Sequence, residues 1–468
     1  MLEKEAKMTK QTFWFREDEV KKRIIADKIL LINIKSNTLL VLNKQASAIW
    51  DQLSSSEAHQ ESDIVKILQR QYANTPIQKL KIDIHNFLST LQEKGLTKQN
   101  DKSLLQPPVL LEKKLRIQGH LSFSEQLHQL AAKYNIPISG GLEITQRCHL
   151  KCLHCYIDNQ PITYKNELST EEFDNLLDQM AKDGCLWLLI TGGEPLLRND
   201  FPHIYLHAKK LGMIITVFTN ATKLTERIIE LFTNYPPFLI EATLHGIKEA
   251  TFDTISGVPG SFRQFKYGIQ LLRDNDVPFH LKMIVMQQNI NEVEFAHQFA
   301  LDLGARDFRF DPMVNADFYH SSKMTNLRIS VKEALRLDLL EPFRSRWKKI
   351  YRTALNKRAT QPTQNNLLFP CRAGKCSFTI SADGYLLPCI LMRKPSYNLR
   401  QISFSRAWQK LNIYATTLQM KKNNLCLKCQ VQTCPKCPAW GYLEHGDAEA
   451  KSQFACALQQ EREKTFLH

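Results

Sequence analysis

The feature that most constrains this chain is the grouping of its cysteines. Of twelve cysteines, three lie within residues 148–155 and eight within residues 371–456. The first residues are charged and lack the apolar segment of a secretory signal, so we expect a cytoplasmic location, where thiols stay reduced. Grouped cysteines in that setting indicate metal ligation rather than disulfides. The twelfth, Cys185, lies in an apolar run and is expected to be a buried strand residue.

The net charge narrows the class of partner. Lysine and arginine are spread along the 468 residues and give a formal net charge of +15. Such an excess suits nucleic acid, an anionic membrane or an acidic partner. The densest run, 344–358, reads as one helix face, so we expect an acidic peptide or small anion and no nucleic acid. No apolar run is long enough to span a bilayer, and we expect no membrane span.

Hydrophobic periodicity divides the chain into five segments. The expected segments are a small α+β unit at 1–100, a linker at 101–138 with room for one helix, an α/β region at 139–310, a helical connector at 311–368 and a cysteine-rich region at 369–468. Within the first segment we expect two strands joined by the turn Lys35-Ser36-Asn37, followed by three helices. Their ranges are 24–34 and 38–42 for the strands, and 45–53, 62–72 and 80–94 for the helices.

The third segment alternates strands with helices. Repeated βα units predict a parallel sheet, and six of them suit a partial (βα)6 barrel, an α/β fold whose sites lie at the carboxyl ends of the strands. Capping pairs begin two of the expected helices, Ser169 with Glu172 and Ser330 with Glu333. The expected strands are 142–145, 186–191, 213–218, 238–243, 279–286 and 308–310.

The first chemical motif follows the first of these strands. Cys148, Cys152 and Cys155 have the spacing Cys-x3-Cys-x2-Cys. Three thiolates on one short loop can hold three corners of a [4Fe–4S] cube and leave the fourth iron open. The alternative is a zinc site that adds His149 or His154, although zinc prefers four ligands, often in CxxC pairs.

This motif resembles the radical SAM superfamily, whose sequences read CxxxCxΦC with an aromatic residue at Φ. His154 fills that place and Tyr156 follows the last cysteine. The resemblance implies that S-adenosylmethionine (SAM) chelates the open iron, and that one electron then cleaves it to a 5′-deoxyadenosyl radical. The three cysteines would be the catalytic residues.

A second motif closes the second expected strand, Thr191-Gly192-Gly193-Glu194-Pro195. Glycines let a backbone approach a ligand closely, and a carboxylate can accept an ammonium group. The motif falls where the superfamily carries GGEP. The resemblance implies that Gly192, Gly193, Glu194 and Pro195 hold the amino group of SAM.

Weaker candidates for contacts with SAM lie at the ends of other strands. Thr219 and Asn220 resemble a ribose-contacting position, and Lys282 could pair with the SAM carboxylate. Tyr156 and Thr243 complete the set. A plain structural role is an equal alternative for these positions, and His245, near the same rim, is expected to be a packed or surface histidine.

The eight C-terminal cysteines are enough for two four-coordinate sites. Zinc ribbons are one alternative, because paired CxxC motifs are their signature. Behind a radical SAM core, the order resembles the SPASM extension, which holds two auxiliary [4Fe–4S] clusters and would bring the total to three. The resemblance implies two interleaved ligand sets: Cys371, Cys376, Cys389 and Cys437 for one cluster, and Cys426, Cys429, Cys434 and Cys456 for the other. Two gaps between these cysteines are one residue shorter than is common.

The N-terminal segment carries a fourth signal. Arg16, Leu42-Asn43, Ala46 and Ile49-Trp50, followed by two amphipathic helices, resemble the PqqD-like fold, a small winged helix. Such a domain can accept a peptide as an added strand on a sheet edge. The alternatives are a winged helix for DNA and a domain that only packs.

Together the resemblances imply a radical SAM enzyme that matures a ribosomally synthesised peptide by forming a thioether or a carbon–carbon crosslink. Its partners would be a precursor peptide, whose leader binds the N-terminal domain, and an electron donor such as a flavodoxin or ferredoxin. One alternative is a sulfatase-maturase-like protein oxidase. Those enzymes carry an aspartate after the cysteine equivalent to Cys389, where this chain has Ile390. Another is a non-catalytic iron–sulfur or zinc scaffold that binds peptide.

Overall fold

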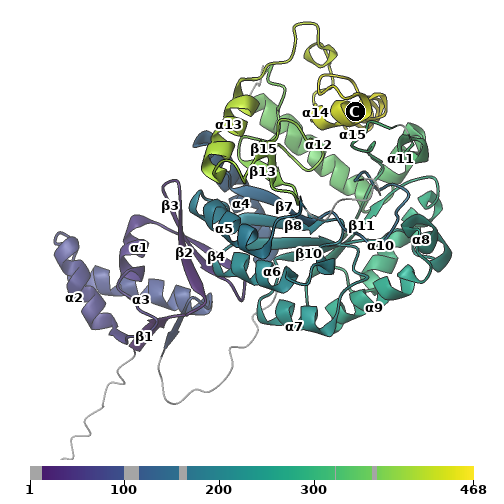
Figure 1. The fold of residues 1–468 in the computed structure, drawn as a ribbon. Coiled ribbons are helices and arrows are strands. Elements are labelled where there is room, and N and C mark those ends of the chain that lie inside the picture. Colours follow the sequence, from purple (N-terminus) through teal and green to yellow (C-terminus); the bar gives the residue numbers. More distant parts are fainter. Residues whose placement is uncertain (1–12, 100–114, 158–165, 322, 361–365, 468) are drawn as a thin grey trace, which may run out of the picture. The chain divides into compact units, whose positions relative to one another are not determined.

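The computed structural model describes residues 13–99, 115–157, 166–321, 323–360 and 366–467, with the backbone alone at 115–123 and 357–360. These residues form two compact units, one drawn from residues 1–130 with 210–212, the other from 131–209 with 213–468. No helix in the described ranges is both long and apolar enough to cross a membrane. We describe each unit by itself (Figure 1).

The described part of the first unit contains two small sheets, three complete helices and most of a fourth, α4 (Leu115–Lys133). One sheet has the order β5-β1-β6 and the other the order β2-β3-β4. The strands are β1 (Phe13–Arg16), β2 (Val20–Ile25), β3 (Lys28–Asn33), β4 (Thr38–Leu42), β5 (His59–Gln60) and β6 (Thr97–Gln99), and the helices are α1 (Lys44–Trp50), α2 (Glu61–Gln71) and α3 (Ile77–Glu93). Trp14, Leu31, Trp50 and Ile84 are buried together in one apolar core, so strands and helices of this unit share an interior of their own.

The expectation of one strand over 24–34 is wrong. The chain turns after Ile25, where Ala26 has a φ of 54°, and β2 and β3 pair as an antiparallel hairpin. The turn predicted at Lys35-Ser36-Asn37 is confirmed, because the Asn33 side chain accepts hydrogen bonds from the Lys35 and Ser36 N–H groups. Strands β1, β5 and β6 escaped prediction because each is too short to show a period.

The second unit is built on a sheet with the order β12-β11-β10-β9-β8-β7-β13-β14-β15. The six strands from β7 to β12 are parallel, which confirms the six expected βα strands with shifts of a few residues at their ends. They are β7 (Ser139–Thr145), β8 (Trp187–Gly192), β9 (Ile214–Thr219), β10 (Leu239–Thr243), β11 (Phe279–Ile284) and β12 (Phe308–Asp311).

Helices follow these strands and continue into the C-terminal third (Figure 1). Both predicted capping boxes are present, at Ser169 with Glu172 and at Ser330 with Glu333. Helix α4 (Leu115–Lys133) lies in the segment expected as a linker. The remaining helices are α5 (Thr170–Lys182), α6 (Phe201–Lys210), α7 (Glu226–Asn234), α8 (Glu249–Ser256), α9 (Ser261–Asp274), α10 (Val293–Asp302), α11 (Val331–Asp338), α12 (Phe343–Thr360), α13 (Phe404–Thr417), α14 (Pro438–His445) and α15 (Gln453–Leu467).

The sheet continues beyond the expected six strands. Strand β13 (Ser377–Ile380) pairs parallel with β7, and β14 (Tyr385–Leu387) and β15 (Tyr397–Asn398) extend the edge antiparallel. Gly140 in β7 makes this possible, because a Cβ there would lie 2.6 Å from the Phe378 ring. The cysteine-rich region therefore begins as part of the same mixed sheet as the parallel strands.

Candidate active site

The loop that carries the first three cysteines leaves β7 and is fastened to the end of α8. The Lys151 N–H donates to the Ser256 carbonyl at 2.8 Å and the Leu153 N–H to the Ile255 carbonyl at 2.9 Å. Gly257 follows α8 with a φ of +68°, and a Cβ there would lie 2.7 Å from the Lys151 carbonyl oxygen. Two backbone hydrogen bonds and one glycine thus fix the loop at the carboxyl ends of the strands.

The thiols on this loop face one another closely enough to interact electrostatically. Burial raises the pKa of the Cys148 thiol to about 11, and the neighbouring Glu194 and Cys155 raise it further. Burial also raises the pKa of Cys152. Thiolates in such surroundings need a nearby cation, which iron would supply. Three thiols on one short loop suit a cluster that spreads its ligands over several irons.

The Gly-Gly-Glu turn packs directly on this loop. Gly192 has a φ of +148°, and a Cβ on Gly193 would lie 2.4 Å from the Arg147 carbonyl oxygen. The Gly193 N–H donates to Thr145 and the Glu194 N–H to Arg147, both at 2.8 Å. Glycine is required here because the backbones of two strand ends meet without room for a side chain.

The Glu194 side chain ties the second strand end to the third. Its carboxylate is fully buried and accepts hydrogen bonds from the Thr219 hydroxyl at 2.8 Å, the Asn220 N–H at 2.8 Å and the Leu196 N–H at 3.1 Å. Burial raises the Glu194 pKa to about 7, while these hydrogen bonds act in the opposite direction. Asn220 also points its amide nitrogen toward the Cys148 sulfur, at 3.9 Å. The structure therefore brings Glu194, Thr219, Asn220 and the cysteine loop together.

The C-terminal thiols lie in two neighbourhoods. The Cys389 thiol interacts electrostatically with Cys437 and Cys371, and Cys376 is fully buried just before β13. The Cys456 thiol interacts with those of Cys434, Cys426 and Cys429. Burial raises the pKa of Cys389 to about 12 and of Cys456 to about 11, so their thiolate forms would need a nearby cation.

A small cavity lies at the second group of thiols. It has a volume of about 40 Å³, and Cys426, Cys434, Cys437 and Cys456 line it. Cys437 borders both groups, since its thiol interacts with Cys371 and, less strongly, with Cys434. Cys389, Cys426 and Cys437 also pack against one apolar cluster that contains Phe369 and Met392. Cysteines gathered around a small space beside an apolar cluster are a suitable setting for an iron–sulfur cluster.

Comparison with known families agrees with this geometry. Residues 142–300, from β7 to α10, match the radical SAM superfamily, and residues 28–96 match coenzyme PQQ synthesis protein D, PqqD. The chain carries a radical SAM domain and a PqqD domain. The first match covers the cysteine loop, the Gly-Gly-Glu turn and the strand ends around them.

Related proteins cover most of the chain. An AdoMet-dependent heme synthase of Methanosarcina barkeri is 24% identical over 68% of this chain and 96% of its own length. The PqqA peptide cyclase of Bradyrhizobium diazoefficiens is 25% identical over 73% of this chain and 92% of its own. The solved structure of Streptococcus suis SuiB bound to precursor peptide SuiA has the same fold, with a TM-score of 0.56, 15% identity and coverage of 95% of this chain and 99% of SuiB.

Within the radical SAM domain, the other predicted SAM contacts lie at the same rim. Thr243 and Lys282 are neighbours across β10 and β11, and both are half-buried. The Tyr156 ring packs edge-on against Phe318 at 5.4 Å, and burial raises its pKa. Cys185 is buried as predicted, although it precedes β8 rather than lying in it. The contacts of Tyr156, Thr243 and Lys282 with SAM stay predictions.

His245 lies closer to the chemistry than its sequence position indicated. The sequence predicted either a packed or a surface histidine, and the side chain is buried. Its Nε2 lies 3.6 Å from the Cys152 sulfur. Its ring meets His154 edge-on at 5.4 Å, and burial lowers the pKa of both, that of His154 to about 4. Two histidines are thus close to the thiols, His154 within the cysteine loop and His245 beside it. The sequence feature that could have indicated this proximity is the position of His245, two residues after β10 at the carboxyl ends of the strands.

Glu194→Gln should weaken SAM binding at least tenfold. Every group that forms a hydrogen bond with this carboxylate is a donor. An amide nitrogen in place of one oxygen would therefore face an N–H or hydroxyl group, and the link between the two strand ends would be weakened. Because the Glu194 pKa is near 7, the ionised form grows as pH rises, and wild-type affinity should increase from pH 6 to pH 8. Calorimetric titration with SAM is the measurement, and the affinity of Glu194→Gln should not change between pH 6 and pH 8. Glu230→Gln, on exposed α7, is the matched control, and equal affinity of both variants would contradict the expectation.

Proposed function

We propose that this chain is a radical SAM enzyme that modifies a ribosomally synthesised peptide. The observation that carries the proposal is the presence of a PqqD domain with its own core in the same chain as a radical SAM site. The relationship to a PqqA peptide cyclase supports a peptide substrate, and the fold shared with SuiB, solved with a precursor peptide, is consistent with it.

The side chains at the strand ends have separate tasks in this proposal. SAM on a [4Fe–4S] cluster would supply a 5′-deoxyadenosyl radical that abstracts a hydrogen atom from the peptide. Cys148, Cys152 and Cys155 would hold the cluster, and Gly192, Gly193, Glu194 and Pro195 would shape the place for the amino group of SAM. Thr219 and Asn220, already fixed by Glu194, would face the ribose, with Tyr156, Thr243 and Lys282 around them.

The N-terminal domain would bind the leader of the precursor. Strand β4 is an edge of its sheet and α3 packs on the same core. Leu40 in β4 and Phe87 in α3 are only partly buried against that core. An edge strand offers main-chain hydrogen bonds, and partly exposed apolar side chains offer selectivity. These features favour peptide recognition by strand addition over a domain that only packs.

The eight C-terminal cysteines would hold two auxiliary [4Fe–4S] clusters, one on Cys371, Cys376, Cys389 and Cys437, the other on Cys426, Cys429, Cys434 and Cys456. The thiol neighbourhoods support this division. Both clusters would be fully ligated by protein, so they would accept an electron rather than bind a substrate thiolate. The donor that delivers electrons from outside would be a flavodoxin or ferredoxin.

Iron analysis tests this division. Three cubes of four irons predict about 12 irons per chain after anaerobic reconstitution. Replacing Cys426 and Cys456 by serine should lower the content to about 8, since only one set loses ligands. Plasma emission spectrometry for iron and zinc is the measurement. Iron near 4 together with stoichiometric zinc would show a zinc module in the C-terminal region instead.

The product would be a thioether or a carbon–carbon crosslink. The test is to incubate the reconstituted, reduced protein with SAM and the short peptides encoded beside its gene, and to seek a peptide that loses two hydrogen atoms by mass spectrometry. A second candidate follows from the relationship to a heme synthase: a tetrapyrrole substrate. Turnover of an iron porphyrin precursor, with every peptide unchanged, would favour that candidate and reject peptide modification.

A further inference from the structure

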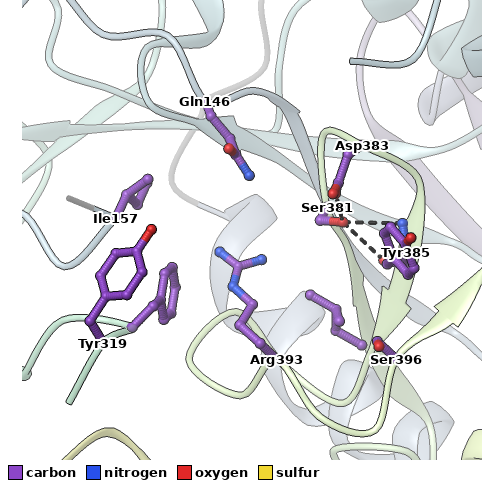
Figure 2. A pocket seen from close by; sticks show the side chains of 10 residues that line it. Gln146, Ile157, Tyr319, Ser381, Asp383, Tyr385, Arg393 and Ser396 are labelled. Atoms are coloured by element: carbon purple, nitrogen blue, oxygen red, sulfur yellow. Dashed lines mark hydrogen bonds between the residues drawn. The ribbon is translucent and has the colours of Figure 1, made fainter. Parts of the chain in front are cut away.

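A cavity of about 500 Å³ lies in the second unit, beside the segments that carry two of the proposed clusters. Gln146, two residues before Cys148, and Ile157, two residues after Cys155, contribute to one side. Arg393, four residues after Cys389, and the β13–β14 hairpin contribute to the other. Figure 2 shows the Arg393 guanidinium pointing into the middle of the cavity, with Gln146 opposite and Asp383 and Ser381 at the hairpin wall.

Arg393 is held in place by a buried carboxylate from a distant part of the chain. Its two terminal nitrogens donate to the two oxygens of Glu143 in β7, at 2.8 and 2.9 Å. Its guanidinium also stacks over the Phe318 ring at 4.1 Å. The Glu143 side chain is 2% exposed, so this pair is shielded from solvent and its geometry is fixed. Mutual attraction to Glu143 raises the Arg393 pKa against the opposing effect of its burial.

Arg393 keeps further N–H donors, but Glu143 offsets its positive charge. A guanidinium carries five N–H donors, and Glu143 occupies two of them. The remaining donors can bind a carbonyl oxygen, yet a substrate carboxylate would meet a cation already neutralised. The other charged group among the lining residues is Asp383, whose carboxylate accepts a hydrogen bond from the Ser381 hydroxyl. Because Arg393 and Glu143 offset each other, Asp383 is the lining residue whose charge is left to act on a substrate side chain.

We propose that this cavity receives the peptide residue next to the reacting carbon, and that Arg393 and Asp383 select a neutral amide or a basic side chain over an acidic one. Arg393 is the positioning donor for a carbonyl oxygen, and Asp383 repels a carboxylate and attracts an ammonium or guanidinium group. The proposal rests on the peptide-modifying function and adds a specificity to it: an acidic leader can serve for recognition at the N-terminal domain, while the residue in the cavity is not acidic.

Ligand-observed NMR on the full-length, reconstituted protein tests the selection directly. The probes are capped tripeptides, acetyl-Ala-Xaa-Ala-amide, in which Xaa is Gln, Lys or Glu. We expect the Gln probe to bind about fivefold more tightly than the Glu probe, as one unfavourable charge contact predicts, and the Lys probe to bind more tightly still. Asp383→Asn keeps the oxygen that accepts from Ser381 and should bring the Lys-to-Glu ratio close to one. Asp302→Asn, on exposed α10, is the matched control and should leave the ratio unchanged.

A second variant keeps the test decisive if Asp383→Asn disturbs the hairpin turn. Ser396→Lys adds a cation at an exposed position on the cavity wall and should reverse the preference toward the Glu probe. Equal binding of the three probes to the wild-type protein, no binding of any of them, or a preference that neither variant alters would overturn the proposal. Selective binding without any peptide turnover would instead reject the proposed function alone, because the probes report on the cavity independently of catalysis.

Discussion

Replacing Cys148, Cys152 and Cys155 together by alanine should abolish the formation of 5′-deoxyadenosine. The three thiols occupy one loop at the carboxyl ends of the strands, beside the Gly-Gly-Glu turn, and no other described cysteine lies on that loop. Without them the open iron that binds SAM cannot form. The anaerobically reconstituted, dithionite-reduced protein should produce deoxyadenosine, and the triple variant none above the rate without enzyme. Liquid chromatography of the quenched reaction is the measurement.

Two observations accompany this loss if the assignment is right. Iron content should fall by one cube, from about 12 to about 8 per chain, because the C-terminal cysteines are untouched. Cys185→Ala is the matched control, since this cysteine is buried beside β8 and should leave deoxyadenosine production unchanged. Undiminished deoxyadenosine production in the triple variant would contradict the assignment of radical SAM chemistry to this loop.

The six parallel strands and the first two motifs were predictable because their signals are local. Each strand of the parallel sheet is an apolar run followed by a helix, and each motif directly follows a strand. Parallel strands bring their carboxyl ends to one rim, so position along the chain predicted proximity in space. Glu194 and Asn220, 26 residues apart, meet in this way.

The features that could not be predicted depend on pairs far apart in sequence. Glu143 and Arg393 are 250 residues apart, and neither belongs to a motif. Strands β13–β15 have four residues or fewer, too few for a period, and they join the sheet because Gly140 leaves room for Phe378. His245 contacts Cys152 across 93 residues. A contact of this kind follows from the packing of the whole unit rather than from any window of sequence.

Deleting residues 1–100 should lower the affinity for a leader peptide at least a hundredfold, about 2.7 kcal/mol, yet spare SAM cleavage in the absence of peptide. The buried residues of the first core lie between Trp14 and Leu96, so the deletion removes a complete interior. The cysteine loop and the Gly-Gly-Glu turn belong to the other unit. Fluorescence anisotropy with a labelled leader, and deoxyadenosine formation by the same truncated protein, measure the two effects.

A milder change to the same domain replaces two exposed lysines on α3 instead of deleting the domain. Lys79 and Lys81 lie near the start of the helix, where they oppose its dipole and gain little locally. If they attract an acidic leader, Lys79→Glu with Lys81→Glu should weaken binding about tenfold at low salt and much less at high salt. Lys182→Glu with Lys266→Glu, on exposed positions of α5 and α9, is the control of equal charge. Equal leader affinity in the full-length and truncated proteins would show that the PqqD domain does not recognise the peptide, and the lysine pair would then belong to an ordinary solvated face.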